Sequence, residues 1–460
     1  MAKTKQSATI IEFEREAVPE HATKPARSFW GMFSSEHVAG TELLIGPLFV
    51  VHGVAAFDVL AGLVIGNILA VLSWRFMTVP IAIKHRLTLY MQMEKIGGKK
   101  LTSIYNMANG LLWCFIAGAM ISVSASAVMV MFKVAPPSLD AVLPENPLMV
   151  AIVLAVGLVI SVVASKGYDS VARFANIAAP WMIVMFIALG LSTLPDLGIH
   201  SFSDFWEKAQ TVIWNGSNQP GFVKFSIWHV IFFSWFGNLA WHIGMGDLTI
   251  FRYARKANYG FASLSGMFLG HYIAWIAAGM LYAVQLQADP GNTTVSPGPL
   301  AMSTMGFAGL LLVLIAGWTT ANPIIYRSGL AFQAINSKWS RVRVTLFAGG
   351  IASIIGIFPG LSMKFLSVAA LYGLILMPVG AVIFADHFLV KRMGMIDFFA
   401  EKKGIAFYLP PAFAWFLTLA FCLLLNLKYG MQIFFLGLPG WFIAIAIYLG
   451  LSYYYQQRKP

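Results

Sequence analysis

The feature that most constrains this chain is a series of long apolar stretches with almost no charge inside them. A transmembrane helix needs about 20 predominantly apolar residues. Twelve stretches are long enough to cross a bilayer: 29–53, 57–81, 104–132, 147–165, 174–194, 223–246, 260–285, 301–326, 344–358, 363–389, 406–427 and 432–455. Because a membrane-spanning β-strand needs only about ten residues, these lengths predict an all-α polytopic membrane protein with 12 transmembrane helices.

The composition supports this fold class. The chain has 460 residues, of which 58% are hydrophobic and 11% are charged, whereas a soluble domain is about 45–50% apolar and about 25% charged. This excludes an ordinary soluble enzyme and a disordered chain. The two cysteines, Cys114 and Cys422, lie within apolar stretches, so they predict neither a disulfide framework nor a metal site.

The positive charge tests the number of spans independently. Of the 31 Lys and Arg residues, 25 fall on the side of the N-terminus, 5 fall on the other side, and Arg75 lies within the second stretch. Four of the 25 are placed after the eighth stretch: Arg327, Lys338, Arg341 and Arg343. Such a bias predicts cytoplasmic termini and explains the net charge of +12 without nucleic acid.

The domain organisation follows from these spans. We expect a cytoplasmic tail at 1–28, a transporter domain at 29–455 and a short cytoplasmic tail at 456–460. Only 195–222 and 286–300 are long connections, so no soluble domain is expected. No motif places a nucleophile, a base and a partner together. Transport is therefore favoured over catalysis, and we predict no enzyme and no cofactor.

Polar residues interrupt the first apolar stretch near its middle. It contains Ser34-Ser35-Glu36-His37 and then Gly40-Thr41-Glu42. Polar groups at membrane depth are costly and are usually functional. The pattern favours an unwound segment that faces a cavity, with Glu36 in a substrate or proton role. The alternative is that Glu36 pairs with another helix for structural reasons.

The sixth stretch is interrupted in a similar way. Trp235 and Phe236 lie at mid-span beside Gly237 and Asn238. Aromatic faces next to a backbone break and an amide are suited to a planar ligand, although helix packing explains the same residues. Since the first and sixth stretches are five spans apart, their matching interruptions predict two five-helix halves related by an inverted repeat.

The eighth stretch carries a distinctive polar segment, Gly317-Trp318-Thr319-Thr320-Ala321-Asn322-Pro323. Pro323 frees a main-chain carbonyl, and the two threonine hydroxyls are hard oxygen donors that can hold a small cation. The alternative is that the hydroxyls bond to the carbonyls of their own helix.

These residues resemble a known family, the nucleobase-cation-symport transporters of the first class, which include cytosine, allantoin and hydantoin permeases. The likeness covers residues 28–430. It is carried by four short motifs in the family's order: Gly66-Asn67-Ile68-Leu69-Ala70, Gly246-Asp247 with Arg252, the segment 317–323, and Ala385-Asp386-His387-Phe388-Leu389-Val390-Lys391-Arg392.

The resemblance implies a LeuT-type 5+5 inverted repeat, with halves at 29–194 and 223–389 and two additional C-terminal helices at 406–455. It implies import of a small nitrogen heterocycle by symport with Na⁺, or with H⁺, through alternating access in a plasma membrane such as the bacterial inner membrane. By match to the family, the sodium ligands are Met32, Ser35, Ala316, Thr319 and Thr320.

The resemblance also implies a substrate pocket. Its candidates are Glu36, Trp113, Phe115, Trp235, Phe236, Asn238 and Asn322. Glu36 departs from the family, which has an amide at this position. A carboxylate favours a ligand rich in N–H donors, such as an aminopyrimidine, a purine edge or a cationic amine, or it takes up a coupling proton. An amino-acid or polyamine permease and a non-transporting membrane receptor are the alternatives.

Overall fold

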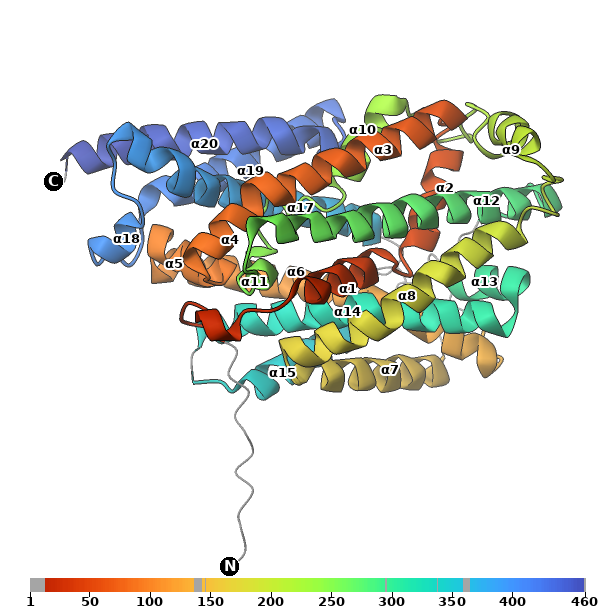
Figure 1. Ribbon diagram of the computed structural model, residues 1–460, viewed down its shortest axis with the longest axis horizontal. Helices are drawn as coiled ribbons and strands as arrows, with labels where there is room; N and C mark the ends of the chain where they lie inside the picture. The colour runs from red at the N-terminus through yellow and green to blue at the C-terminus, as the bar shows by residue number, and fades with distance from the viewer. Residues whose placement is uncertain are drawn as a thin grey trace, which may run out of the picture.

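The computed structural model describes residues 13–135, 143–144, 146–293, 296–336, 338–358 and 365–458. Within these ranges the chain is helical, with two isolated β-bridges and no strand. Most of the long helices run roughly along the long axis of the molecule, whereas α2 crosses it steeply (Figure 1). Parts of both predicted tails (1–12 and 459–460) and the start of the predicted tenth span (363–364) lie outside the described residues.

The first predicted span is broken into two helices. These are α1 (Ala26–His37) and α2 (Glu42–Val51), separated by Val38–Thr41. The second span is α3 (Ala56–Ser73), a π-helical turn (Trp74–Thr78) and α4 (Val79–His85), and α5 (Leu89–Gly97) follows it. Spans three to five are α6 (Lys99–Met131), α7 (Pro147–Ser165) and α8 (Tyr168–Ser192).

The sixth predicted span is also broken. After α9 (Phe202–Lys208) come α10 (Ile227–Phe236), a long unwound segment and the short α11 (Leu248–Phe251). The seventh span consists of a 3₁₀ turn (Ala257–Ala262), a π-helical segment η5 (Ser265–Tyr272) and α12 (Ile273–Ala288). The unwinding therefore occurs where Gly237, Gly244 and Gly246 cluster, since glycine tolerates non-helical backbone at little steric cost.

The rest of the chain forms seven further α-helices among the described residues. They are α13 (Pro297–Met305), α14 (Phe307–Ile335), α15 (Arg341–Gly356), α17 (Phe365–Ala385), α18 (Phe399–Lys402), α19 (Leu409–Tyr429) and α20 (Ile433–Arg458). The predicted eighth span at 301–326 is wrong at both ends. Gly306 at φ +57° separates α13 from α14, and α14 continues to Ile335.

Nine helical stretches among the described residues are long and apolar enough to cross a membrane. Adding the two broken pairs, α1–α2 and α10–α11, and the 16-residue α15 gives the twelve predicted spans. Many large apolar side chains remain exposed, including Phe57, Ile177, Val184 and Leu427. Such a surface is stable in contact with lipid, whereas large exposed apolar surfaces are rare on proteins surrounded by water.

Apart from α17, α19 and α20, which pack on one another, the helices form two packed groups. In one group α3 packs on α10, α12 packs on α2, and α1 packs on η5. In the other group α6 packs on α14, and α15 packs on both α6 and α7. Helix α8 contacts α1, α12 and α14 and thus members of both groups. The two broken helices therefore belong to the same group, and α1 also contacts α14 of the second group.

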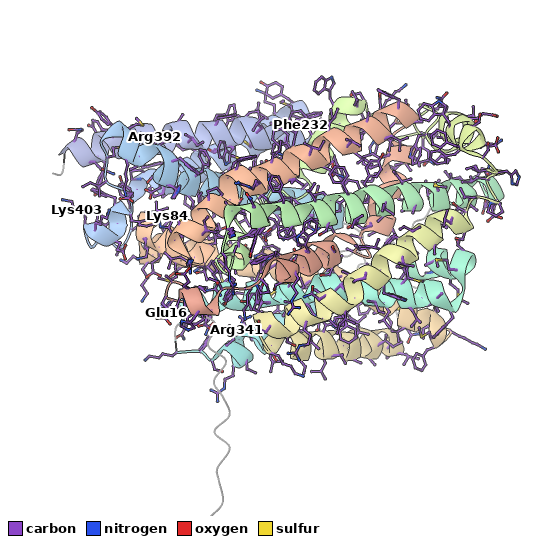
Figure 2. The ribbon with its side chains drawn as sticks, in the orientation of Figure 1. Glu16, Lys84, Phe232, Arg341, Arg392 and Lys403 are labelled. Carbon is purple, nitrogen blue, oxygen red and sulfur yellow. The ribbon has the colours of Figure 1, made fainter. Side chains whose placement is uncertain are left out.

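Several basic residues lie toward one end of the molecule (Figure 2). Helices α5 and α18 lie at one end and α9 and α13 at the other (Figure 1). Figure 2 labels Lys84, Arg392 and Lys403 toward the end that holds α5 and α18, and Arg341 in the same half. These four positions agree with the predicted grouping of basic residues, whereas the position of Arg327 does not. The sequence analysis placed Arg327 in a loop, whereas it lies within α14 and is 1% exposed.

Candidate functional site

A cavity lies at the breaks in the first and sixth spans. It encloses about 940 Å³ of empty space, part of which is open to solvent. Aromatic side chains of the second break and of α12 form much of its wall, namely Phe233, Phe236, Trp241 and Trp275. Polar groups reach it from α1, the first break, α2, the segment after α10, η5 and α14: Glu36, Thr41, Glu42, Asn238, His271 and Thr320. Apolar walls with a few convergent polar groups are the usual form of a small-molecule site.

The helix breaks explain why these side chains meet. Helix α1 ends at His37 and α2 begins at Glu42, so the polar residues of the first span stand at two helix ends. Helix α10 ends at Phe236, and the turns that follow place Asn238 and Trp241 beside the cavity. Main-chain polar groups freed by unwinding are tolerated at membrane depth where they line a cavity or are buried in protein.

Glu36 lies at the cavity but is not a free carboxylate. Arg327 Nη1 donates to Glu36 Oε1 at 2.8 Å, and Arg327 Nη2 donates to Glu36 Oε2 at 3.2 Å. The same Nη2 donates to Asp247 Oδ1 at 2.7 Å. Arg327 thus joins α14 to the end of α1 and to the residue that precedes α11. A planar guanidinium is suited to this bidentate geometry.

The surroundings complete this charged cluster of Glu36, Arg327 and Asp247. Trp74 Nε1 donates to Asp247 Oδ2 at 2.8 Å, and the Arg327 guanidinium lies 5.5 Å from the centroid of the Trp113 ring. Both Arg327 and Asp247 are buried. Buried charges are stable only when they are paired and hydrogen-bonded. Because Arg327 already balances the charge of Glu36, this carboxylate does not require a ligand rich in N–H donors.

A second carboxylate, Glu42, lines the same cavity. Its Oε2 accepts a hydrogen bond from Trp275 Nε1, and its Oε1 accepts one from the Thr41 hydroxyl at 3.4 Å. His271 Nε2 lies 3.7 Å from Glu42 Oε1. The His271 ring stacks on the Trp275 ring, with their centroids 4.3 Å apart. Glu42 was noted in the sequence, whereas His271 and Trp275 were not singled out.

The structure brings three of the predicted substrate residues to the cavity and not the other four. Glu36, Phe236 and Asn238 line it. Trp113 packs against Trp241 and Tyr372, with ring centroids 5.0 and 4.8 Å apart. Phe115 is half-buried and is not part of the lining. The predicted residues that line the cavity are therefore those beside the two helix breaks, Glu36, Phe236 and Asn238.

The other two predicted residues point elsewhere. The Trp235 indole Nε1 donates to Ser73 Oγ at 3.0 Å, and its ring stacks on Phe236 at 4.7 Å. In its hydrogen-bonded orientation, the Asn322 amide donates to the Ile160 carbonyl on α7 and accepts from Trp318 Nε1, each at 3.0 Å. Neither residue lines the cavity. Of the two predicted aromatic residues of the sixth span, Phe236 lines the cavity, and Trp241 lines it as well.

The five predicted sodium ligands supply oxygen atoms on two helices that pack together, α1 and α14. Ser35 Oγ donates to the Met32 carbonyl at 3.0 Å. Thr319 and Thr320 Oγ1 both donate to the Ala316 carbonyl, at 3.0 and 3.1 Å. Each hydroxyl donates a hydrogen bond to a carbonyl of its own helix, which is the stated alternative for the two threonines. Each hydroxyl oxygen nevertheless retains lone pairs that can bind a hard cation. The donor set therefore fits Na⁺ in chemistry.

Two signals in the sequence could have revealed the residues that were missed. Arg327 is followed by Ser328-Gly329-Leu330-Ala331-Phe332, an apolar continuation that indicates a longer helix rather than a loop. His271 and Trp275 are four residues apart, so they share one face of a helix. A polar pair on one face of an otherwise apolar stretch indicates an inward-facing position.

Two broken helices around a central cavity, within a bundle of long apolar helices, define a membrane protein of the LeuT fold. Comparison with solved structures supports this. The chain matches Mhp1, a nucleobase-cation-symport-1 family transporter, in a closed conformation with bromovinylhydantoin bound, with a TM-score of 0.72 at 15% identity over 98% of this chain and 97% of that chain. It also matches the inward-facing conformation of Mhp1, with a TM-score of 0.71 at 13% identity over 99% and 96% of the two chains.

A more distant match points to the same fold. A Na⁺-coupled sialic acid symporter in a substrate-bound outward-open state has a TM-score of 0.65 at 14% identity over 93% of this chain and 90% of that one. No family model and no curated protein matches the sequence. The likeness confirms the predicted LeuT-type fold, and it supports the resemblance to the nucleobase-cation-symport family.

Proposed function

We propose that the protein is a secondary active transporter that imports a nucleobase or a related nitrogen heterocycle, together with a cation, by alternating access. The observation that carries the proposal is the aromatic-walled cavity between the two broken helices. Discontinuous helices in matching positions of an inverted repeat place a binding site near the membrane midplane. The fold shared with Mhp1 and the sialic acid symporter supports the same class of protein.

The chemistry of the wall favours a flat ligand. Phe236 and Trp241 offer aromatic faces for stacking, and the Asn238 amide offers both a donor and an acceptor for the edge of a ring. An amide that pairs with a ring edge discriminates strongly against ligands that lack the matching groups. A structural neighbour, Mhp1, was solved with a hydantoin derivative bound, which supports a small nitrogen heterocycle.

Cation coupling follows from the arrangement of α1 and α14. A Na⁺ held by oxygens of Met32, Ser35, Ala316, Thr319 and Thr320 would link a helix of the broken group to a helix of the other group. A bound cation shifts the equilibrium between two conformations only by its difference in affinity for them. We therefore expect the ion to favour the conformation in which both helices contribute ligands.

The orientation is proposed from the charge distribution. Lys84, Arg341, Arg392 and Lys403 lie in one half of the molecule, and cytoplasmic loops are enriched in such residues (Figure 2). We propose that this half faces the cytoplasm, in a plasma membrane such as the bacterial inner membrane.

A thermal-shift screen of the purified protein tests the proposal. Cytosine, adenine, hydantoin, phenylalanine and spermidine are each added with and without Na⁺, and uptake into proteoliposomes is measured for every compound that stabilises the protein. Stabilisation and accumulation of a heterocycle support the proposal. Stabilisation by phenylalanine or spermidine alone would instead identify an amino-acid or polyamine permease, and binding without accumulation would identify a receptor.

Two variants test the position of the pocket. Trp241→Ala removes a cavity wall, and we expect at least a tenfold loss of heterocycle uptake. Trp235→Ala removes a neighbouring aromatic residue outside the lining. Loss of uptake in Trp235→Ala with normal uptake in Trp241→Ala would show that the ligand does not occupy this cavity.

A third variant, Thr319→Ala, tests the sodium ligands. We expect weaker stimulation of uptake by Na⁺, with the same ligand specificity. Uptake that ignores Na⁺ but follows a pH gradient would assign the coupling to protons.

A further inference from the structure

We propose that Glu42 and His271 form a proton-binding pair in the cavity and that this pair couples transport to the proton gradient. The inference rests on the proposed transport function and adds a proton to it as a second coupling ion beside Na⁺. It concerns residues that the resemblance does not assign. The pair is buried, is held by neutral hydrogen-bond donors and has no Lys or Arg partner among the described residues.

Glu42 is held in place by neutral donors. It is the first residue of α2 and is 2% exposed. Trp275 and Thr41 donate hydrogen bonds to its two oxygens. Among the residues that the structure describes, no Lys or Arg pairs with Glu42, and its ion-pair partner is His271 at 3.7 Å. An isolated ionised carboxylate at such a site is costly, so a positive charge must balance it or a proton must neutralise it.

His271 is placed to supply that positive charge. It lies on η5 and is 6% exposed, and its Nδ1 is buried with no hydrogen-bond partner in the described structure. Its ring stacks on Trp275, whose indole N–H bonds Glu42. An aromatic face stabilises a cation above it. Trp275 therefore supports both members of the pair, the carboxylate through its edge and the imidazole through its face.

The charges around the pair do not replace the proton. On α1, the His37 ring centroid lies 4.6 Å from that of His271. The Nδ1 atom of His37 is already hydrogen-bonded to the Phe33 carbonyl. Glu36, next to His37, is already paired with Arg327. Helix α3 presents the neutral amide of Asn67 to Met267 on η5. On α12, the ionisable side chain is that of Tyr282, whose hydroxyl donates a hydrogen bond to the Thr293 carbonyl in the following loop.

The unwound segment after α10 adds one more titratable group near His37. His242 Nε2 bonds the Trp235 carbonyl at 2.7 Å, so it is engaged with its own segment. The pair itself then has two states. With one proton it is neutral overall, as a carboxylate with an imidazolium or as a carboxylic acid with an imidazole, and without that proton it carries one negative charge.

These two states explain coupling to a neutral ligand. Water in the cavity supplies the proton, which the pair holds while the ligand is bound, and the pair returns it to water on the other side after the conformational change. Since the neutral pair lacks the desolvation cost of an uncompensated charge, closure of the cavity over a ligand favours the protonated state. A cationic ligand would compete with this proton, whereas a neutral heterocycle would require it.

Infrared titration of the full-length protein in lipid tests proton binding without any ligand. We expect a carboxyl signal that titrates in the wild type, disappears in Glu42→Gln and shifts in His271→Gln. Glu36→Gln is the matched control, because it removes the other cavity carboxylate, and its titration should retain the Glu42 signal. An unchanged titration in Glu42→Gln would overturn the proposal, whatever the transport assays show.

Ligand binding tests the coupling. The affinity for whichever of cytosine, adenine or hydantoin stabilises the protein should fall about tenfold per pH unit once the pair loses its proton. Glu42→Gln mimics the protonated shape and should remove this pH dependence. The same pH dependence in Glu42→Gln, or affinity that rises with pH, would overturn the proposal. If none of the three binds, the proposed function fails while the infrared titration still decides the proton site.

Discussion

At the scale of single residues, Arg327 is the most consequential side chain. It is buried in α14 and holds two carboxylates, Glu36 and Asp247, that belong to the other packed group. Burying three charges is expensive, and a buried pair is often no more stabilising than an apolar replacement of the whole cluster. Removal of one partner is different, because it leaves the remaining charges without compensation.

Arg327→Met is therefore expected to destabilise the protein by about 3–5 kcal/mol. Thermal unfolding in lipid or detergent measures the loss. Arg327→Lys keeps the charge but loses the two-pronged contact with Glu36, so we expect an intermediate effect. The triple variant Arg327→Met, Glu36→Gln, Asp247→Asn should recover much of the stability. Equal stability of Arg327→Met and the wild type would show that the cluster is not formed.

The sequence predicted part of this site. The polar residues of the first span indicated a cavity, and a structural pairing of Glu36 with another helix was the stated alternative. The partner could not be identified, because Arg327 stands at the end of an apolar stretch, where a cation usually marks a loop. Trp113 and Asn322 were carried over from a resemblance, and a shift of one helical turn or of a helix face places such residues outside a cavity.

At the scale of elements, the breaks in the first and sixth spans were predicted correctly because polar residues and glycines coincide there. The boundary between α13 and α14 was missed, because residues 301–316 are largely apolar and Gly306 alone turns the chain. The close contact between α1 and η5 was not predicted either. It depends on Gly270, where an added Cβ would lie 2.4 Å from the His37 carbonyl oxygen.

Gly270→Ala should therefore push η5 away from α1. We expect a destabilisation of about 1–3 kcal/mol, because a methyl group has no room against the backbone. Gly350→Ala on α15 is the matched control, since an added Cβ there meets nothing within 4 Å. It should leave the melting temperature equal or slightly higher, because alanine is the better helix former. Equal melting temperatures for both variants would contradict the packing of η5 on α1.

The connection before α18 provides a pH-dependent contact outside the membrane. Burial by itself raises the pKa of Asp397, but hydrogen bonds from Lys402 and Lys391 outweigh it and lower the pKa below its usual value. A carboxyl with a lowered folded-state pKa stabilises the fold above its unfolded pKa, and this contribution is lost as the pH falls through the folded pKa.

Asp397→Asn should consequently reduce stability at pH 7 by about 0.5–1 kcal/mol, the usual worth of a partly exposed ion pair. The difference from the wild type should shrink as the pH falls below about 4, where the wild-type carboxyl also becomes neutral. Glu207→Gln on the exposed face of α9 is the control and should show no such trend. Thermal unfolding across this pH range measures both variants.

At the scale of the whole molecule, the two packed groups of helices determine what the protein can do. The cavity is lined from both groups and from α17, with Thr320 on α14, Asn238 after α10 and Ala370 on α17. If the groups rock against each other, a residue on the wall changes its access to water while the rest of each group moves as a unit. The charged cluster around Arg327 crosses the same boundary and must be retained or broken in each conformation.

Cysteine labelling can follow this motion, because the native Cys114 and Cys422 are both buried. Ala370→Cys places a thiol on the cavity wall, and we expect a membrane-impermeant maleimide to label it from one side. A bound heterocycle should slow the labelling by occupying the cavity. Ala321→Cys, at a fully buried position of α14, is the control and should remain unlabelled.

Glu36→Gln weakens the link between the groups, so in this background the rate of Ala370→Cys labelling should change severalfold, as expected for a shift of about 1 kcal/mol between two conformations. Labelling of Ala370→Cys that ignores both the ligand and Glu36→Gln would show that the cavity does not alternate its access.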